Sequence, residues 1–500
     1  MRVVYPIPMD FDDIVEQNPW WRRPENVQLD PKIREFQDAK IKWYPRLMHT
    51  IDLEKDILYS LRGPRQVGKT TMLKLMIKDL LNRGIDAKAI LYLTCDVISG
   101  HDALVEAVTQ YLDYSKRLGP EVRKYLFIDE ITSVKDWPKA IKYLKDIGRL
   151  SNTTIILTGS HSLDLKYQTE RLPGRRGEGD GAINKILMPM KFAEYVETVA
   201  PELNKEMGLP LEAKVRQEMF FKLCNGEIPP FISETLRLYQ KDLNAILDNY
   251  LLTGGIMRAI ESFFSKDRID ESIYELYIRA LIGDLGKWRY GETIAKQVLR
   301  SAMQKMCSRV SLNNIASENE IGSHNTVSSY LQAMDESFVL NNIYLVDLNS
   351  KEPVFIKERK IYFTDPFIYH AVRGWVFGRP DYHDLSKDVL LDSELKGNIM
   401  EMVISDHLIR QAYALDPSDV FSPHEHVMYF RKKDTDREID FILKHRKSLY
   451  PFEVKYRKRI GRKELENLFI LRKGVLITKD ILSTHNQYSL IPVELFLLLI

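Results

Sequence analysis

Apolar runs and helical segments alternate in the first part of the chain. Residues 56–61 and 125–130 each hold a run of mostly apolar positions, and residues 153–160 have an apolar centre that ends in hydroxyls. Such runs are typical of strands buried on both faces of a parallel sheet. Between the last two runs, apolar residues at one-turn spacing predict an amphipathic helix through Trp137, Ile141, Leu144 and Ile147. The alternation from about residue 52 to 199 therefore predicts a parallel sheet covered by helices.

The pattern turns predominantly helical after Ala200 and Pro201 and predicts a helical lid up to about residue 288. Residues 293–373 then have the pattern of a winged helix-turn-helix, in which Ile321 and Gly322 form the turn and Ser323 caps the second helix. The predicted inward positions are Leu312, Ile315 and Ala316 on the first helix, and Val327, Leu331 and Met334 on the second.

The exposed face of that second helix carries neither Lys nor Arg. Proteins that read bases or phosphates usually depend on these two residue types. The sequence therefore favours a structural or protein-contact role for this helix and leaves DNA reading as the alternative. The face consists of His324, Asn325, Ser328, Ser329 and Gln332.

Two short runs near the end of the chain, residues 437–443 and 449–455, predict adjacent strands of a hairpin. The last apolar run, residues 490–500, contains Pro492 and Glu494 and is too short to cross a bilayer of about 30 Å. We interpret it as a core element or a partner-facing strand, and we expect no contact with a membrane.

Length and composition refine this division. A chain of 500 residues suggests several domains, and a net charge of +2 does not mark the whole chain as a nucleic-acid binder. The three cysteines are widely spaced, which argues against a disulfide framework or a zinc ribbon. No secretory signal is visible at the start, so we expect a cytoplasmic location. The predicted domains are an N-terminal arm at 1–50, a nucleotide-binding core at 51–200, a helical lid at 201–290, a winged helix at 291–375 and an α/β domain at 376–500.

Residues 63–70 have the spelling of a phosphate-binding P-loop between a predicted strand and a predicted helix. Such a loop wraps a triphosphate with backbone N–H groups, while its lysine reaches the outer phosphates and its threonine ligates Mg²⁺. The helix that starts at Thr71 adds a positive N-terminal dipole. The sequence therefore predicts ATP and Mg²⁺ as cofactors, bound by Gly63, Pro64, Arg65, Gln66, Val67, Gly68, Lys69, Thr70 and Thr71.

A second signal lies at the end of the run 125–130. Two carboxylates follow a buried strand, at the sheet edge where ligands bind in parallel sheets. Asp129 is predicted to support Mg²⁺ and Glu130 to activate the attacking water. At the end of the run 153–160, Thr158 or Ser160 is predicted to sense the terminal phosphate.

A glycine-rich loop with three arginines covers residues 170–179. An arginine inserted at the nucleotide would neutralise transition-state charge, either in the same chain or from a neighbouring subunit of a homo-oligomer. Arg175 and Arg176 are the candidates, with Arg171 as a third. The alternative is an ordinary exposed basic loop.

A second candidate site lies on the predicted hairpin near the C-terminus. Glu453 and Lys455 share one face of their strand, and a suitable register would bring Asp440 beside them. Two carboxylates could then bind Mg²⁺ while the lysine orients a hydroxide, and Glu401 on an upstream helix could complete the ligation. The alternative is a solvated strand face with paired charges.

Positive charge is concentrated around this hairpin. Residues 431–463 contain 13 Lys and Arg and 5 Asp and Glu, so the segment carries 13 − 5 = +8. With Tyr450 and Tyr456 among the cations, the segment predicts a surface that follows a nucleic-acid backbone, or one that binds an acidic protein.

Taken together, these motifs resemble the archaeal and bacterial AAA-type ATPases that carry a C-terminal restriction-endonuclease-like domain. The resemblance runs from about Arg46 to Lys455 and includes further landmarks at 189–192, 254–255 and 362–366. It implies an α/β fold with ATP hydrolysis, a winged helix after the lid and a nuclease-type fold in residues 376–500. Thr158 or Ser160 stands where such ATPases usually have a polar amide.

The sequence therefore predicts a Mg²⁺-dependent ATPase that acts as a switch on or near DNA. Two outputs remain open: a metal-dependent DNA nuclease gated by ATP, or a catalytically silent docking module with ATP-controlled affinity for a protein partner.

Overall fold

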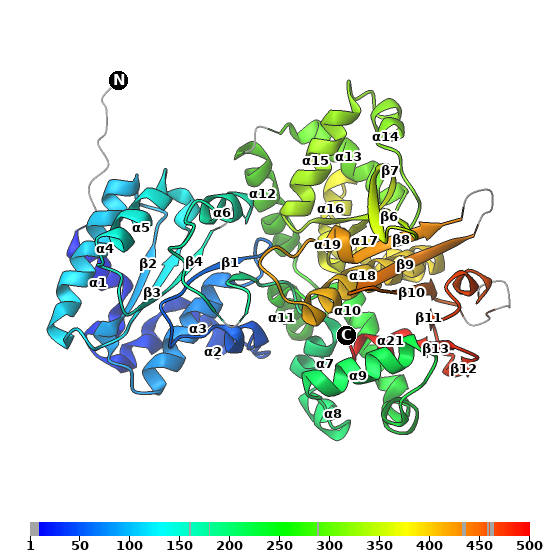
Figure 1. Ribbon diagram of the computed structural model, residues 1–500, viewed down its shortest axis with the longest axis horizontal. Coiled ribbons are helices and arrows are strands. Elements are labelled where there is room, and N and C mark those ends of the chain that lie inside the picture. The colour runs from blue at the N-terminus through cyan, green and yellow to red at the C-terminus, as the bar shows by residue number, and fades with distance from the viewer. Residues whose placement is uncertain are drawn as a thin grey trace. The chain divides into compact units, whose positions relative to one another are not determined.

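The computed structural model describes residues 10–159, 162–179, 181–287, 290–432, 437–457, 460 and 465–500, except the side chains of 162 and 163. It divides the chain into two compact units, residues 1–188 and 189–500 (Figure 1). Both units are mixtures of helices and strands, so the predicted α/β fold class is confirmed.

The first unit is built on a five-stranded, fully parallel sheet in the order β2-β3-β4-β1-β5. The chain leaves β1 for the far edge at β2 and returns through β3 and β4, so α3 covers one face while α4 and α5 cover the other (Figure 1). The strands are β1 Leu58–Arg62, β2 Ile90–Thr94, β3 Lys124–Asp129, β4 Thr153–Thr158 and β5 Asn184–Ile186. The helices are α3 Lys69–Asn82, α4 His101–Ser115, α5 Trp137–Asp146 and α6 Ser162–Thr169.

The sheet and helices of this unit lie close to their predicted places, with one correction. Trp137, Ile141 and Leu144 are buried on α5, as the periodicity predicts. Ile147 is the residue that ends α5 and its side chain is 51% exposed. The helix ends at Asp146, one residue before the predicted fourth core position.

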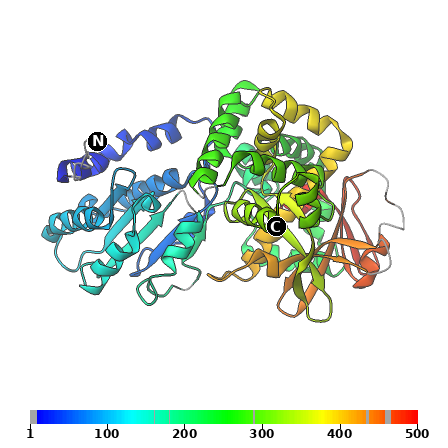
Figure 2. The same ribbon diagram turned by 90° about the horizontal axis from the view of Figure 1, so that it is seen from above.

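The N-terminal arm covers the free edge of the sheet. It contains α1 Phe11–Gln17, α2 Pro31–Asp38 and 3₁₀ turns at Pro19–Trp21, Pro24–Leu29 and Arg46–Thr50 (Figure 2). The Asn18 amide bonds both the N–H and the C=O of Tyr92, at 2.7 and 2.8 Å. The Trp20 and Trp21 indoles both donate to the C=O of Ile90. Side chains of the arm thus satisfy backbone groups that an edge strand would otherwise leave unpaired.

The second unit starts with helices and continues into a large mixed sheet. Its helices before that sheet are α7 Phe192–Val199, α8 Pro201–Glu206, α9 Ala213–Cys224, α10 Gln240–Thr253, α11 Met257–Lys266, α12 Glu271–Lys287, α13 Glu292–Gln304, α14 Leu312–Glu318 and α15 His324–Glu336. The later helices are α16 Pro366–Phe377, α17 Tyr382–Leu391, α18 Ser393–Leu415, α19 Pro423–His426 and α21 Val493–Leu497.

The eight strands follow the order β12-β13-β11-β10-β9-β8-β6-β7. They are β6 Leu340–Asp347, β7 Glu352–Phe363, β8 Val427–Arg431, β9 Glu438–His445, β10 Ser448–Lys455, β11 Gly474–Thr478, β12 Ser483–His485 and β13 Tyr488–Pro492. The predicted hairpin is confirmed, because β9 and β10 pair antiparallel across a turn at residues 446–447. The antiparallel pair β6 and β7 joins the same sheet through β8. One sheet therefore runs through both regions that we predicted as a winged helix and an α/β domain.

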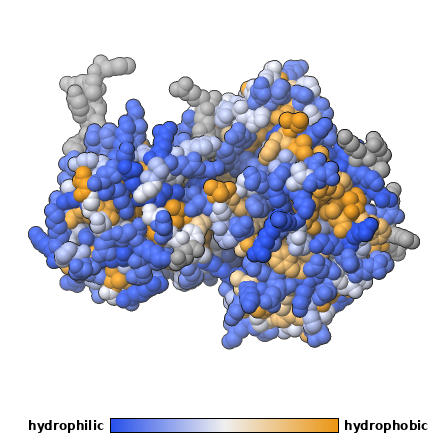
Figure 3. Space-filling view, in the orientation of Figure 1, coloured by the Kyte–Doolittle hydropathy of each residue, from blue (hydrophilic) through white to orange (hydrophobic). Residues whose placement is uncertain are grey.

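The helices predicted around Ile321 and Gly322 are present as α14 and α15, and the Ser323 hydroxyl accepts from the N–H of Asn325. The C-terminal apolar run forms β13 and α21 and is buried, so it is a core element. Among the helices that the structure describes, none has the length and apolarity needed to cross a membrane. Figure 3 shows a largely hydrophilic surface with scattered apolar groups.

Candidate functional site

The predicted P-loop joins β1 to α3 and has the backbone that its glycines allow. Gly63 has φ +150°, and a Cβ there would lie 2.0 Å from the carbonyl oxygen of Leu187. Gly68 has φ +103° and directly precedes the first residue of α3. Both positions need glycine, the first because of space and the second because of its left-handed backbone. Of the remaining loop residues, Pro64, Arg65, Gln66 and Val67 span the turn, with Gln66 at φ +63°.

Lys69 lies over this loop. Its ammonium donates to the carbonyl oxygens of Gly63 and Pro64, at 3.0 and 3.1 Å, and the residue is 9% exposed. Thr70 and Thr71 follow it in the first turn of α3. The positive charge is thus placed at the start of a helix, where the helix dipole also favours an anion.

Asp129 lies beside the loop and is almost fully buried among hydroxyl groups. Its Oδ2 accepts from Thr70 Oγ1 at 2.8 Å and from the Tyr92 hydroxyl at 2.9 Å, and its Oδ1 pairs with Thr158 Oγ1. Burial, and then the charge of Asp129, raise the pKa of Tyr92, so its hydroxyl stays a donor.

The strand order explains why these residues meet. β4 lies between β1 and β3, with Leu61 opposite Thr158 and Ile128 opposite Leu157. The carboxyl ends of the three parallel strands therefore share one edge, which is where ligands bind in such sheets. Glu130 follows β3 with φ +55° and its N–H donates to Thr158 Oγ1 at 3.2 Å. Thr158 thus bridges Asp129, the predicted support of the metal ion, and Glu130, the predicted catalytic acid.

These residues fit a Mg-nucleotide. Thr70 and Asp129 present a hydroxyl and a carboxylate within 2.8 Å of each other, and such hard oxygen donors suit Mg²⁺. Apart from its chain neighbours, no atom lies within 4 Å of the Cβ position of Gly68, so the loop has open space at this glycine. Ser160, the other predicted phosphate sensor, lies outside the described residues.

The sequence analysis did not identify the residues that hold Tyr92 in place beside Asp129. The Lys74 ammonium, on α3, lies 3.1 Å above the centre of the Tyr92 ring and 2.9 Å from Asp30 Oδ2. Burial lowers the pKa of Lys74, while Asp30 opposes that shift. Asp30 belongs to the N-terminal arm, so the arm reaches Asp129 through Lys74 and Tyr92. The sequence gives one indication of this support, because Tyr92 stands among the aliphatic residues of β2.

The candidate arginines lie away from the loop of their own chain. The C=O of Arg176 accepts from the N–H of Leu58, at the amino end of β1, and its side chain reaches Ser60. Arg175 forms a two-bond pair with Asp146 at the surface. The P-loop begins at Gly63, three residues beyond Ser60, which is about 10 Å at 3.3 Å per residue. A role for either arginine in a neighbouring subunit stays a prediction.

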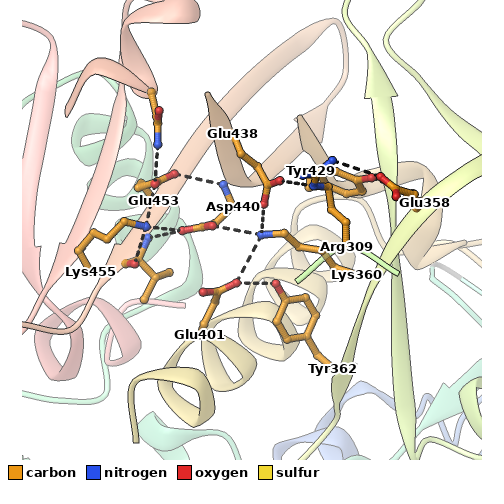
Figure 4. Close-up of polar contacts among 12 residues, drawn as sticks. Arg309, Glu358, Lys360, Tyr362, Glu401, Tyr429, Glu438, Asp440, Glu453 and Lys455 are labelled. Carbon is orange, nitrogen blue, oxygen red and sulfur yellow. Dashed lines mark hydrogen bonds and ion pairs between the residues drawn. The ribbon is translucent and has the colours of Figure 1, made fainter. Parts of the chain in front are cut away.

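The second predicted site is a compact cluster of charges in the C-terminal sheet (Figure 4). Asp440 Oδ2 accepts from Lys455 Nζ and from the N–H of Val454, at 3.1 and 3.0 Å. Lys455 Nζ lies 2.7 Å from Glu453 Oε1, and Glu453 Oε2 accepts from the N–H of Asp440. The register of β9 and β10 therefore brings Asp440, Glu453 and Lys455 together, which was the condition for the predicted site.

A lysine that the sequence did not single out lies inside this cluster. Lys360 Nζ, on β7, is 2.8 Å from Glu438 Oε1, 3.1 Å from Asp440 Oδ1 and 3.5 Å from Glu401 Oε1. Glu401, on α18, also accepts from the Tyr362 hydroxyl at 2.6 Å. Lys360 belongs to the charged run 357–360, which is typical of a solvated strand, so its burial has no signal in the sequence.

The charged groups of the cluster shift one another's pKa values. Burial, together with the charge of Asp440, raises the pKa of Glu401 and of Glu453 to about 7. Burial would raise the pKa of Asp440 as well, but Lys455 and Lys360 outweigh it and lower that pKa below its ordinary value. Asp440 is thus the carboxylate that stays ionised. Among the described residues, no group of three His, Cys, Asp or Glu side chains has a geometry that could hold a metal ion.

The three remaining landmark motifs, at 189–192, 254–255 and 362–366, contact one another in the interior of the second unit. Asp365 Oδ2 accepts from the N–H of Gly255 at 2.8 Å, while its Oδ1 caps α16. A Cβ on Gly254 would lie 2.0 Å from Asp365 Oδ1. The N–H of Met190 donates to the C=O of Gly255 at 3.0 Å. These contacts hold the end of α10, the start of α16 and the first residues of the second unit together.

Three segments of the chain match different family models. Residues 55–196 match a family model described as an AAA domain. Residues 244–377 and 396–494 match two models described as domains of unknown function, DUF8612 and DUF4143. An uncharacterised protein of Haemophilus influenzae is 22% identical over 437 residues, which cover 87% of this chain and 91% of that protein.

Two solved structures are similar to the chain at low identity. The Walker-type ATPase PABY2304 of Pyrococcus abyssi is 12% identical, with 74% of this chain and 99% of that chain covered and a TM-score of 0.37. Cdc6p of Pyrobaculum aerophilum is 13% identical, with 75% and 97% covered and a TM-score of 0.22. The segment that matches the AAA model, residues 55–196, contains the P-loop and the strand ends that carry Asp129 and Thr158, which supports an AAA-type P-loop domain there.

Proposed function

We propose that this protein is a Mg²⁺-dependent ATPase whose nucleotide state controls the second unit, and that the second unit binds DNA. The observation that carries the ATPase is the convergence of Thr70, Asp129, Thr158 and Glu130 at one sheet edge beside the P-loop. This set contains a metal-binding pair and a second acid, which binding alone does not need.

Each residue of the set has one role in this proposal. Bound MgATP supplies the reacting phosphate and a divalent charge that offsets its negative oxygens. Lys69 holds the outer phosphates, and the Thr70 and Asp129 oxygens hold the metal ion with its water shell. Glu130 accepts a proton from the attacking water. Thr158 holds the orientation of Asp129 and of the Glu130 backbone, so both acids keep a fixed position.

The proposal that the second unit binds DNA is supported by the way the 431–463 segment distributes its charge. Three of its five acids, Glu438, Asp440 and Glu453, are engaged in the internal cluster with Lys360 and Lys455. Arg431, Arg446, Lys447 and Arg457 are exposed. The outward charge of the described part is therefore mainly positive, as a phosphate-tracking surface requires. The winged-helix region, α13 to α15 with β6 and β7, is part of this proposal as a protein-contact or DNA-contact element.

The nuclease alternative has one observation in its favour and one against it. The convergence of Asp440, Glu453 and Lys455 favours it. The ammonium of Lys360 lies between Asp440 and Glu401, where an ion shared by these carboxylates would have to bind. We therefore propose DNA binding without cleavage. Metal-dependent nicking of a supercoiled plasmid that Asp440→Ala abolishes would reverse this choice.

Two measurements on the purified protein test the proposal. Phosphate release from ATP should require Mg²⁺ and stop when EDTA is added. Fluorescence anisotropy should detect DNA binding at low salt, with an affinity that falls linearly on a log–log plot against salt concentration. DNA affinity that is the same with ATP, ADP and no nucleotide would show that the nucleotide does not control the second unit. Capture of an acidic protein in place of DNA would favour the docking alternative.

Tyr92→Phe tests the support of Asp129. The change removes the hydroxyl that donates to Asp129 but keeps the ring beneath the Lys74 ammonium. A hydrogen bond to a charged group contributes about 1.5–3 kcal/mol, so we expect kcat to fall by roughly tenfold while the protein stays folded. Steady-state ATPase kinetics measure this, with the 53% exposed Tyr143 changed to Phe as the matched control. An unchanged kcat would show that Thr70 and Thr158 are sufficient.

A further inference from the structure

The ammonium of Lys360 is surrounded by three carboxylates that come from two other elements. Glu438 and Asp440 come from β9, Glu401 comes from α18, and Lys360 itself comes from β7 (Figure 4). The Lys360 side chain has no exposed surface, whereas the side chains of Glu401 and Glu438 are 12% and 23% exposed. A buried charge of this kind persists only with opposite charges at contact distance.

Protein donors already occupy the oxygens that a metal ion would use. Both oxygens of Asp440 accept, Oδ1 from Lys360 and Oδ2 from Lys455 and the N–H of Val454. Both oxygens of Glu453 are also occupied, because Oε2 accepts from the N–H of Asp440 and Oε1 accepts from Asn467 Nδ2 at 2.9 Å. A divalent ion could bind Asp440 and Glu401 together only after displacing the Lys360 ammonium.

The surroundings keep Lys360 charged. Burial alone would lower the pKa of Lys360, but Asp440, Glu401 and Glu438 outweigh burial and raise that pKa well above its ordinary value. The ring of Tyr429, centred 5.9 Å from the ammonium, also favours a cation at this place. Glu438 is held in turn by Arg309, whose Nε lies 3.0 Å from Glu438 Oε2.

We propose that Lys360 is the built-in cation of a carboxylate site that would otherwise bind a divalent metal ion. The ammonium joins β7, β9 and α18 and leaves the cluster without metal-dependent chemistry. The class of ion that fits the vacated site is a hard divalent cation such as Mn²⁺ or Mg²⁺, because all its ligands would be carboxylate oxygens. This inference is independent of ATP hydrolysis in the first unit.

The test removes the ammonium and measures Mn²⁺ binding by calorimetry, without nucleotide, in the full-length protein. Lys360→Ala and Lys360→Met should each bind one more Mn²⁺ than the unchanged protein, and Mn²⁺ should raise their Tm. Adding Asp440→Asn to either variant should remove the extra ion. Lys444→Met is the matched control, since Lys444 pairs with the exposed Glu352 at the other end of β9. That control should gain no Mn²⁺.

A second arm keeps Lys360 in place, so it does not depend on how well the Lys360 variants fold. Asp440→Asn alone should leave its Mn²⁺ stoichiometry unchanged, because Lys360 already fills the site. Loss of a bound Mn²⁺ on Asp440→Asn would overturn the proposal. So would a folded Lys360→Met variant that binds no more Mn²⁺ than the unchanged protein. Rescue of a poorly folded Lys360→Ala variant by Mn²⁺, but not by the same concentration of Na⁺, would support it.

Discussion

Lys69→Ala is expected to abolish ATP turnover in an otherwise folded protein. Lys69 carries the positive charge of the P-loop, and its ammonium rests on two carbonyl oxygens of that loop. Loss of one preorganised donor to a transition state typically lowers kcat by about 10²–10³, and loss of charge at the outer phosphates weakens binding as well. Phosphate release and calorimetric titration with an ATP analogue measure the two effects.

Lys78→Ala is the matched control for this change. Lys78 lies on the same helix, α3, in its third turn and is half-buried. It should keep both the turnover and the nucleotide affinity of the unchanged protein. Undiminished turnover in Lys69→Ala would show that the loop is not the site of hydrolysis and would remove the basis of the proposed function.

Glu130→Gln should separate hydrolysis from binding. The amide keeps the size of the side chain and leaves the backbone bond from Glu130 to Thr158 intact, but it cannot accept a proton from water. General-base catalysis contributes about 10²–10⁴ in rate, so kcat should fall by that factor while the affinity for ATP is retained. Single-turnover kinetics and nucleotide titration provide the two readouts.

Glu121→Gln is a suitable control because Glu121 is exposed and precedes β3 at the opposite end of that strand. If DNA affinity depends on the nucleotide, the Glu130→Gln protein should stay in its ATP-bound affinity state after ATP is added. Rapid return to the affinity of the nucleotide-free protein would contradict the role given to Glu130. Equal loss of ATP binding and turnover would assign Glu130 to binding instead.

The link from the N-terminal arm to Asp129 extends the candidate nucleotide site beyond the matched AAA segment. Asp30 pairs with Lys74, and Lys74 lies over the ring of Tyr92. A buried ion pair that loses one partner leaves a desolvated charge, so changes in the arm should be felt at Asp129. The arm is thus part of the support of the nucleotide site, although it lies outside residues 55–196.

The sequence predicted the sites whose residues are held together by local backbone geometry. The P-loop is eight consecutive residues between a strand and a helix, and its glycines are required by the backbone they adopt. Asp129 and Glu130 end a buried strand, and parallel strands bring their carboxyl ends to one edge. Asp440, Glu453 and Lys455 lie on a two-strand hairpin whose alternation and short turn nearly fix the register.

Only the tertiary structure decided which distant side chains complete these sites. Tyr92 reaches Asp129 because β2 and β3 are neighbours. Lys360 enters the C-terminal cluster although β6 and β8 lie between β7 and β9 in the sheet. Strand order is set by packing across the whole sheet, so residues far apart along the chain carry no local sign of it. A lysine in a charged run looks solvated until the surrounding elements bury it, and here that burial places a cation among three carboxylates.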